Sequence, residues 1–350
     1  MKFKKWLILV TILSIFDTTN YYLDIYKEMY KTEVGQNIII FSRRQFNEKD
    51  KEFLARLKDS GIENIAINQL FYQDSINSND IVEAIVPEEY INDLIKEAKN
   101  KKINLLFRWA ISSRDGKPRT EINPQNFARW FENYKKIAME MAEFSEKNEI
   151  PYYSLGCEID HIVSRHKENF IELTKEIKKI YSGKIGYCWN VVSTSNLEEI
   201  LSLEEILETD LIFLDCYLPL TNPKKAKWQW LYYLDEINGI ASKTKKKVLI
   251  TEIGYRSVER SNERPWDWHY KGNFDEEIQQ MCFETFFQAL REYPTIYDRV
   301  NHVEMAFIWG SGYGDLTKIE EDSLGYTPWG KKAEKTIIDH AKSCHIFKKN

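Results

Sequence analysis

Two glutamates carry the clearest potential for chemistry in this sequence. Glu158 and Glu252 each stand at the end of a short apolar run, a pattern that would fix each carboxylate at the end of a buried strand. Two carboxyl groups about 5–5.5 Å apart can hydrolyse a glycosidic bond with retention, because one protonates the leaving oxygen while the other attacks the anomeric carbon. The alternative is that each glutamate makes only a structural salt bridge.

The elements that would position these glutamates follow a regular alternation. Eight short runs rich in β-branched and aromatic residues lack strict apolar/polar alternation, which is typical of parallel strands buried on both faces. These predicted strands are 37–41, 64–69, 104–109, 152–157, 185–189, 211–217, 248–253 and 303–309. Eight strands separated by helices predict an α/β fold, a single (β/α)8 TIM barrel, with a three-layer α/β fold as the alternative.

Helical periodicity fills the intervals between the predicted strands. The clearest helix covers 124–147, where Phe127, Trp130, Phe131 and Tyr134 fall on one face. Other helices are expected at 49–58, 88–100, 165–181, 224–245 and 276–291. Residues 17–35 are expected to form a helical lead-in, and 329–346 a closing helix.

Active sites of such barrels form at the carboxyl ends of the strands. Strands four and seven are not neighbours, so the geometry predicts that Glu158 and Glu252 face each other across the barrel mouth. Tyr217 is expected to hydrogen-bond Glu252, and Trp309 to stack on a sugar ring. The candidate substrate-binding residues at or beyond the strand ends are Asn68, Tyr72, Arg108, Trp109, Asn190, Tyr217, Arg256, Trp268 and Trp309.

Composition narrows the class of ligand. The net charge of −5 disfavours binding to nucleic acid, and 43% hydrophobic residues disfavour disorder. The aromatic content of 14% favours a surface for flat, partly polar ligands such as sugars, although core packing explains many of the rings. The six histidines form no HExxH or paired spacing, so neither a metal nor another cofactor is expected.

The first 17 residues resemble a targeting segment. A basic start precedes the uncharged run WLILVTILSIF, which is too short for an ordinary membrane span and fits a signal peptide or an N-terminal anchor. A buried helix is the alternative. We therefore expect a secreted or cell-surface protein with one catalytic domain over 18–346 and no other membrane contact. The five cysteines show no metal-binding spacing, and three lie in strand-like runs, which predicts buried thiols.

Several motifs carry a resemblance to a known family. The segments are NQLFYQ at 68–73, INP at 122–124, WFENY at 130–134, SLGCE at 154–158, TEIGYRS at 251–257, RPWDW at 264–268 and YTPWGK at 326–331. Over roughly residues 36–340 the sequence resembles glycoside hydrolase family 113, the β-mannanases of the retaining clan A. The resemblance implies Glu158 as acid/base, Glu252 as nucleophile, β-1,4-mannan or manno-oligosaccharides as substrate, and no metal.

One position departs from the wider clan. Many members carry asparagine before the acid/base, where it contacts the sugar 2-hydroxyl, and here that position is Cys157. A thiol is a weak hydrogen-bonding group, so another residue must serve that hydroxyl, with Asn190 and Asn68 as candidates. Two other hypotheses about the function remain open: a retaining hydrolase of another β-glycan, and a non-catalytic carbohydrate-binding barrel. The sequence leaves the oligomeric state open.

Overall fold

The computed structural model describes residues 29, 31–39, 45–82, 86–310 and 324–348. The predicted leader over 1–17 and most of the expected lead-in lie outside these residues. Among the helices that are described, none combines the length and the apolar character needed to cross a bilayer.

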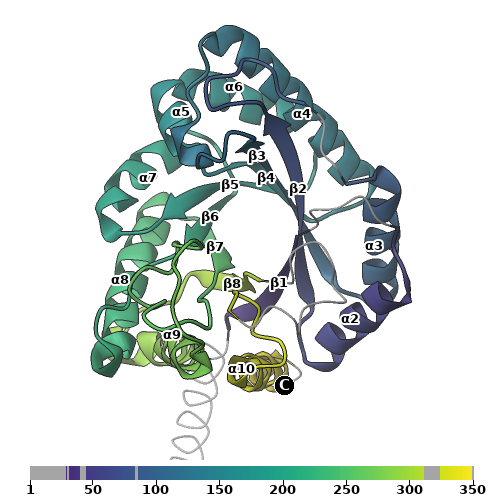
Figure 1. The fold of residues 1–350 in the computed structure, drawn as a ribbon. Helices are drawn as coiled ribbons and strands as arrows, with labels where there is room; N and C mark the ends of the chain where they lie inside the picture. The colour runs from purple at the N-terminus through teal and green to yellow at the C-terminus, as the bar shows by residue number, and fades with distance from the viewer. Residues whose placement is uncertain (1–28, 30, 40–44, 83–85, 311–323, 349–350) are drawn as a thin grey trace, which may run out of the picture.

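Eight parallel strands close into one barrel, which confirms the predicted (β/α)8 fold (Figure 1). The strands are β1 (Glu33–Ile39), β2 (Asn64–Gln73), β3 (Asn104–Ser113), β4 (Tyr152–Cys157), β5 (Lys184–Val191), β6 (Leu211–Cys216), β7 (Lys247–Ile253) and β8 (Val303–Ile308). Each strand pairs with the next along the chain, and β8 pairs with β1 to close the ring. Residues 33–35 belong to β1, so the expectation of a helix there was wrong.

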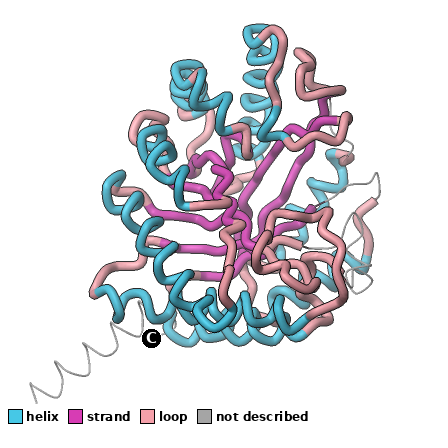
Figure 2. Tube along the Cα trace, turned by 60° about the vertical axis from the view of Figure 1, so that its left-hand side comes forward, coloured by secondary structure: helices cyan, strands magenta, loops and turns pink. Residues whose placement is uncertain are grey.

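The helices surround the sheet, as Figure 1 and Figure 2 show. They are α2 (Glu48–Asp59), α3 (Glu88–Asn100), α4 (Phe127–Lys147), α5 (Asp160–Arg165), α6 (Lys167–Ile177), α7 (Leu197–Glu204), α8 (Ala226–Thr244), α9 (Glu276–Tyr297) and α10 (Lys332–Lys348), with short 3-10 turns η1 (Arg119–Glu121), η2 (Thr194–Asn196) and η3 (Pro223–Lys225). The helix expected over 165–181 is divided at His166. Helix α7 was not predicted, because eight residues give too short a periodic signal.

Strands β2 and β3 are longer than the sequence indicated. Each has ten residues, and they pair continuously from Asn64 and Asn104 to Gln73 and Ser113. Tyr72, expected after its strand, is therefore part of β2. Side chains alternate between the two faces of a strand, so neighbouring residues of β2 and β3 point to opposite faces of the sheet.

Two cores hold the fold together. A small apolar cluster, which includes Leu106, Phe213, Leu249 and Phe307, fills the barrel. A much larger cluster packs the outer face of the sheet against the helices. All five cysteines are free and buried, which confirms the prediction for the three in strands. Since the barrel is filled from within, polar groups inside it must satisfy one another near its mouth.

Candidate active site

Glu252 is fixed within β7 by two short contacts. Its Oε1 lies 2.8 Å from Arg108 Nη2, and the Tyr217 hydroxyl donates to its Oε2 at 2.6 Å. The second contact confirms the hydrogen bond that we predicted. Burial first, and then the charge of Glu252, raise the pKa of Tyr217 well above its ordinary value, so the phenol stays a neutral donor. Both contacts fix the orientation of its carboxylate.

Arg108 joins Glu252 to the polar layer inside the barrel. Its side chain, only 1% exposed, reaches from β3 to Asp215 on β6, where Nη2 lies 2.7 Å from Oδ2. Nη1 donates to Asn37 Oδ1 at 3.1 Å and to the Thr251 carbonyl at 3.3 Å. Burial opposes a charge here, but the carboxylates raise the pKa of Arg108 well above its ordinary value. The guanidinium is a fully engaged cation that holds four strands together.

Glu158 follows β4 in an unusual backbone conformation. Its φ of 54° lies in the left-handed region, which costs an L-residue roughly 1–2 kcal/mol. Its backbone N–H donates to the Cys188 carbonyl at 2.9 Å. The next N–H, of Ile159, donates to the Tyr187 hydroxyl at 2.7 Å, and that hydroxyl donates to Asp160. Strand β5 therefore holds the strained segment that carries Glu158, and strain of this kind is typical of functional sites.

The carboxyl group of Glu158 is weakly paired. Arg119 Nη1 lies 3.6 Å from its Oε2, and the side chain is 17% exposed. Burial raises the pKa of Glu158; the positive charge of Arg119 opposes this rise, and the negative charge of Glu252 adds to it. Burial also raises the pKa of neighbouring Asp160, to about 7, although backbone and tyrosine hydrogen bonds oppose the rise. A carboxyl with a raised pKa can donate a proton.

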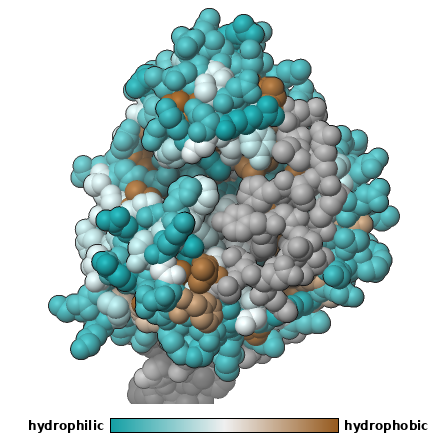
Figure 3. All heavy atoms as spheres, viewed as in Figure 1, coloured by the Kyte–Doolittle hydropathy of each residue, from teal (hydrophilic) through white to brown (hydrophobic). Residues whose placement is uncertain are grey.

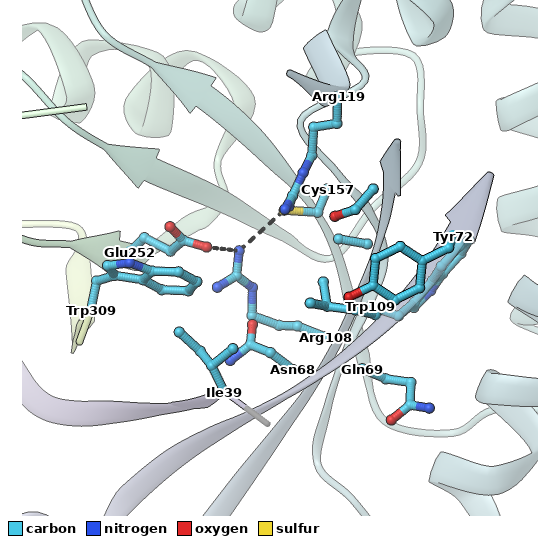
Figure 4. Close-up of a pocket in the computed structure, with 13 residues that line it drawn as sticks. Ile39, Asn68, Gln69, Tyr72, Arg108, Trp109, Arg119, Cys157, Glu252 and Trp309 are labelled. Carbon is cyan, nitrogen blue, oxygen red and sulfur yellow. Dashed lines mark hydrogen bonds and ion pairs between the residues drawn. The ribbon is translucent and has the colours of Figure 1, made fainter. Parts of the chain in front are cut away.

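A cavity of about 100 Å³ opens beside these groups (Figure 4). Figure 3 shows the corresponding face as mostly hydrophilic, with a hollow near its centre. Six of the predicted site residues line the cavity: Asn68, Tyr72, Arg108, Trp109, Glu252 and Trp309. Arg119 and Cys157 line it as well. The cavity therefore combines charged donors, a carboxylate and aromatic rings, as a polar ligand with flat faces requires.

The ring of Trp109 does not point into this cavity. Arg108 points into the barrel, so the next residue points outward. The Trp109 ring packs 4.8 Å from that of Tyr134 and 5.8 Å from that of Phe71, measured between centroids. Its indole N–H donates to the Tyr153 hydroxyl at 3.0 Å. The ring that we expected at a sugar site thus packs in the outer core.

Five other predicted residues are absent from the lining of the described cavity: Glu158 and Tyr217, which contact the lining residues Arg119 and Glu252, and Asn190, Arg256 and Trp268, which lie apart. The Asn190 backbone N–H donates to Asp160 at 3.0 Å. Arg256 donates to the Tyr270 carbonyl at 2.6 Å and holds the loop between β7 and α9. Trp268, on the same loop, is 58% exposed. Their places were assigned from strand ends alone, which do not specify where a long loop carries its side chains.

Sequence reasoning missed Arg119 and Asp215. Asp215 lies two residues before the end of a predicted strand, a signal that could have identified it; Arg119 sits in a loop without periodicity. Asp215 also lies with Cys157 and Cys188 in a group whose potential ligand atoms are within 4.8 Å of one another. Arg108 Nη2 lies 3.3 Å from Cys157 Sγ and 2.7 Å from Asp215, and its positive charge there opposes a bound cation.

The family is decided by a match over most of the chain. The sequence model of Glycoside Hydrolase Family 113 matches residues 40–297. The chain belongs to this family. It is therefore a glycoside hydrolase, and its substrate is a glycan. Among curated protein sequences, none matches the chain significantly.

Solved structures share the fold of this family 113 member at low sequence identity. A complex of a GH113 β-1,4-mannanase is 20% identical with a TM-score of 0.73, covering 90% of this chain and 99% of its own. The GH113 β-mannanase AaManA from Alicyclobacillus acidocaldarius is 16% identical with the same TM-score, covering 90% and 97%. A family 5 mannosidase from Rhizomucor miehei is 10% identical with a TM-score of 0.58, covering 86% and 88%.

Proposed function

We propose that this protein is a retaining, endo-β-1,4-mannanase-like hydrolase that cleaves mannan or manno-oligosaccharides by double displacement. Glu252 attacks the anomeric carbon and forms a covalent glycosyl-enzyme, while Glu158 protonates the leaving oxygen. Glu158 then takes a proton from the water that releases the sugar. No metal or other cofactor takes part in these steps.

The difference between the two carboxyl groups carries this assignment. Glu252 receives a guanidinium and a phenol at 2.8 and 2.6 Å, and these donors hold its carboxylate in one orientation, as a nucleophile needs. Glu158 is partly buried, has one long ion pair at 3.6 Å, and has a pKa that desolvation raises, as a general acid needs. Environments that differ in this way are typical of acid and nucleophile pairs.

Support for mannan as the substrate comes from the relatives. Two solved family 113 neighbours are named as β-1,4-mannanase and β-mannanase. A retaining hydrolase of another β-glycan uses the same pair of carboxyl groups and is the main competing function. A non-catalytic glycan-binding barrel is a further alternative.

A substrate panel tests the proposal. Purified protein is incubated with mannan, glucomannan, xylan and cellulose, and new reducing ends are measured. We expect release from mannan and glucomannan, with products that retain the β configuration by NMR at early times. Release from xylan or cellulose alone would overturn the choice of substrate, and inverted products would overturn the mechanism. Binding to mannan without any product would support the non-catalytic alternative.

We also propose that residues 1–17 direct export, as a signal peptide or an anchor, and leave the domain over 18–346 outside the cell. The basic start and the apolar run support this proposal. Fractionation of cells that express the full chain, with N-terminal sequencing of the product, tests it. A cytoplasmic product with an intact N-terminus would overturn it.

A further inference from the structure

Two arginines reach the cavity, and their partners differ sharply (Figure 4). Arg108 is 1% exposed and contacts two carboxylates and several other acceptors. Arg119 comes from η1, in the loop after β3, and its side chain is 23% exposed. One arginine is buried in the protein's own network, and the other borders the space where a ligand would bind.

The N–H donors of Arg119 find few hydrogen-bond acceptors among the described protein groups. Within the described part of the chain, its polar contacts are Cys157 Sγ at 3.5 Å and Glu158 Oε2 at 3.6 Å, both through Nη1. Sulfur is a weak acceptor, and 3.6 Å exceeds the usual length of a charge-assisted hydrogen bond. A guanidinium carries five N–H donors and does not lose its charge. Its remaining donors therefore suit an acceptor on a ligand.

Two other candidate donors, Asn68 and Cys157, already donate to protein groups. The Asn68 amide group donates to Asn37 Oδ1 at 3.0 Å and to two backbone carbonyls. Asn190 is not among the described residues that line the cavity. Cys157 precedes Glu158, and its thiol donates to Asp215 at 3.3 Å. Arg119 both contacts Glu158 and lines the cavity, and most of its donors have no acceptor among the described protein groups.

We propose that Arg119 is a substrate-binding residue whose guanidinium donates to a sugar hydroxyl beside the bond being cleaved. This inference rests on the proposed function, because it takes Glu158 as the group that protonates the glycosidic oxygen. A neutral hydroxyl fits better than an anionic group, since Glu158, Glu252 and Asp215 already supply negative charge here. The hydroxyl belongs either to carbon 2 of the attacked sugar or to the leaving sugar.

Three substrates distinguish these sources and test the contact. They are 4-nitrophenyl β-mannobioside, its analogue without the hydroxyl at carbon 2 of the attacked sugar, and mannotetraose, whose leaving group is a sugar. Arg119→Met is compared with the wild type on each. Arg114→Met is the control, because Arg114 lies in the same loop and its side chain is 54% exposed.

A hydrogen bond to a charged donor predicts a roughly 10- to 100-fold loss of kcat/KM in Arg119→Met where the contact exists. If the partner is the hydroxyl at carbon 2, the loss appears with both hydroxylated substrates and falls below about threefold with the deoxy analogue. If the partner is on the leaving sugar, the loss appears with mannotetraose alone. Arg119→Lys keeps the charge without the planar fork and should recover only part of the loss.

An equal loss on all three substrates would overturn the proposal, because it would show that Arg119 acts only through Glu158 or through the fold. A loss of kcat/KM below threefold on all three substrates would also overturn the proposal. Thermal unfolding of each variant separates a fold defect from a lost contact. If the wild type cleaves none of the manno-substrates, the proposed function fails instead; the Arg119 comparison then moves to deoxy analogues of the glycan that it does cleave.

Discussion

Glu252 and Glu158 differ in how the protein holds them: Glu252 lines the cavity, and Glu158 contacts Arg119, which also lines it. Glu252 belongs to a strand, is 4% exposed, and is fixed by two contacts of 2.8 Å or less. Glu158 stands one residue beyond its strand, at φ 54°, and has a single ion pair of 3.6 Å. The proposed nucleophile is thus paired closely, whereas the proposed proton donor is only partly buried and is paired loosely.

Removing Glu252 should have the largest effect. Glu252→Ala is expected to lower kcat on mannan by roughly four orders of magnitude or more, since the covalent step loses its nucleophile. Added azide should restore cleavage of an activated aryl mannoside and yield a glycosyl azide. Glu263→Ala, on the exposed side of the loop after β7, serves as the control. Unchanged activity in Glu252→Ala would refute the nucleophile assignment.

Removing Glu158 should have an effect that depends on the leaving group. Glu158→Gln is expected to lower kcat/KM by roughly 10²- to 10⁴-fold on manno-oligosaccharides, whose leaving oxygen needs a proton. A dinitrophenyl mannoside needs no such proton, so its glycosylation rate should fall much less. A pre-steady-state assay compares the two. Equal losses on both substrates would show that Glu158 is not the general acid.

Tyr217→Phe tests how closely the nucleophile must be held. Loss of one hydrogen bond to a carboxylate predicts a roughly 10- to 100-fold decrease in kcat/KM with the fold intact. Tyr233→Phe is the matched control, because its hydroxyl donates to the Pro219 carbonyl from α8, away from the cavity. If Tyr217→Phe and Tyr233→Phe lost activity equally, the hydrogen bond from Tyr217 would have no specific role in holding Glu252.

The pH profile tests the loose pairing of Glu158. The charge of Arg119 lowers the pKa of Glu158, so Arg119→Met should raise it further. The general acid must be protonated, and kcat/KM falls as pH rises through its pKa. The alkaline limb of the profile should therefore move to higher pH in Arg119→Met and stay in place in Arg119→Lys. A move to lower pH would contradict the assignment.

The exposed loop should give the smallest effect. Trp268→Ala is expected to change the free energy of unfolding by less than about 0.5 kcal/mol. If the ring stacks on a long glycan, KM should rise roughly two- to tenfold for polymeric mannan and stay constant for mannobiosides. Trp109→Phe should instead lower the free energy of unfolding and leave KM unchanged, because the Trp109 ring packs in the outer core. Isothermal binding and thermal unfolding measure both.

The sequence predicted the barrel well because eight β-rich runs separated by helical periodicity leave few topologies open. It also predicted the contact between Tyr217 and Glu252, since both residues end neighbouring strands. The direction of Trp109 was missed because Arg108 and Trp109 were both assigned to the site as strand-end residues, although alternation places neighbours on opposite faces of β3. Arg119 was missed because loops carry no period from which a position can be read.

The polar layer around Arg108 has a consequence for folding kinetics. Its guanidinium, from β3, contacts side chains or carbonyls of β1, β6 and β7. These partners are distant in sequence, so the layer assembles only when the ring closes between β8 and β1. During refolding, helical circular dichroism should therefore recover before hydrolytic activity. The delay between them measures the time needed to close the barrel.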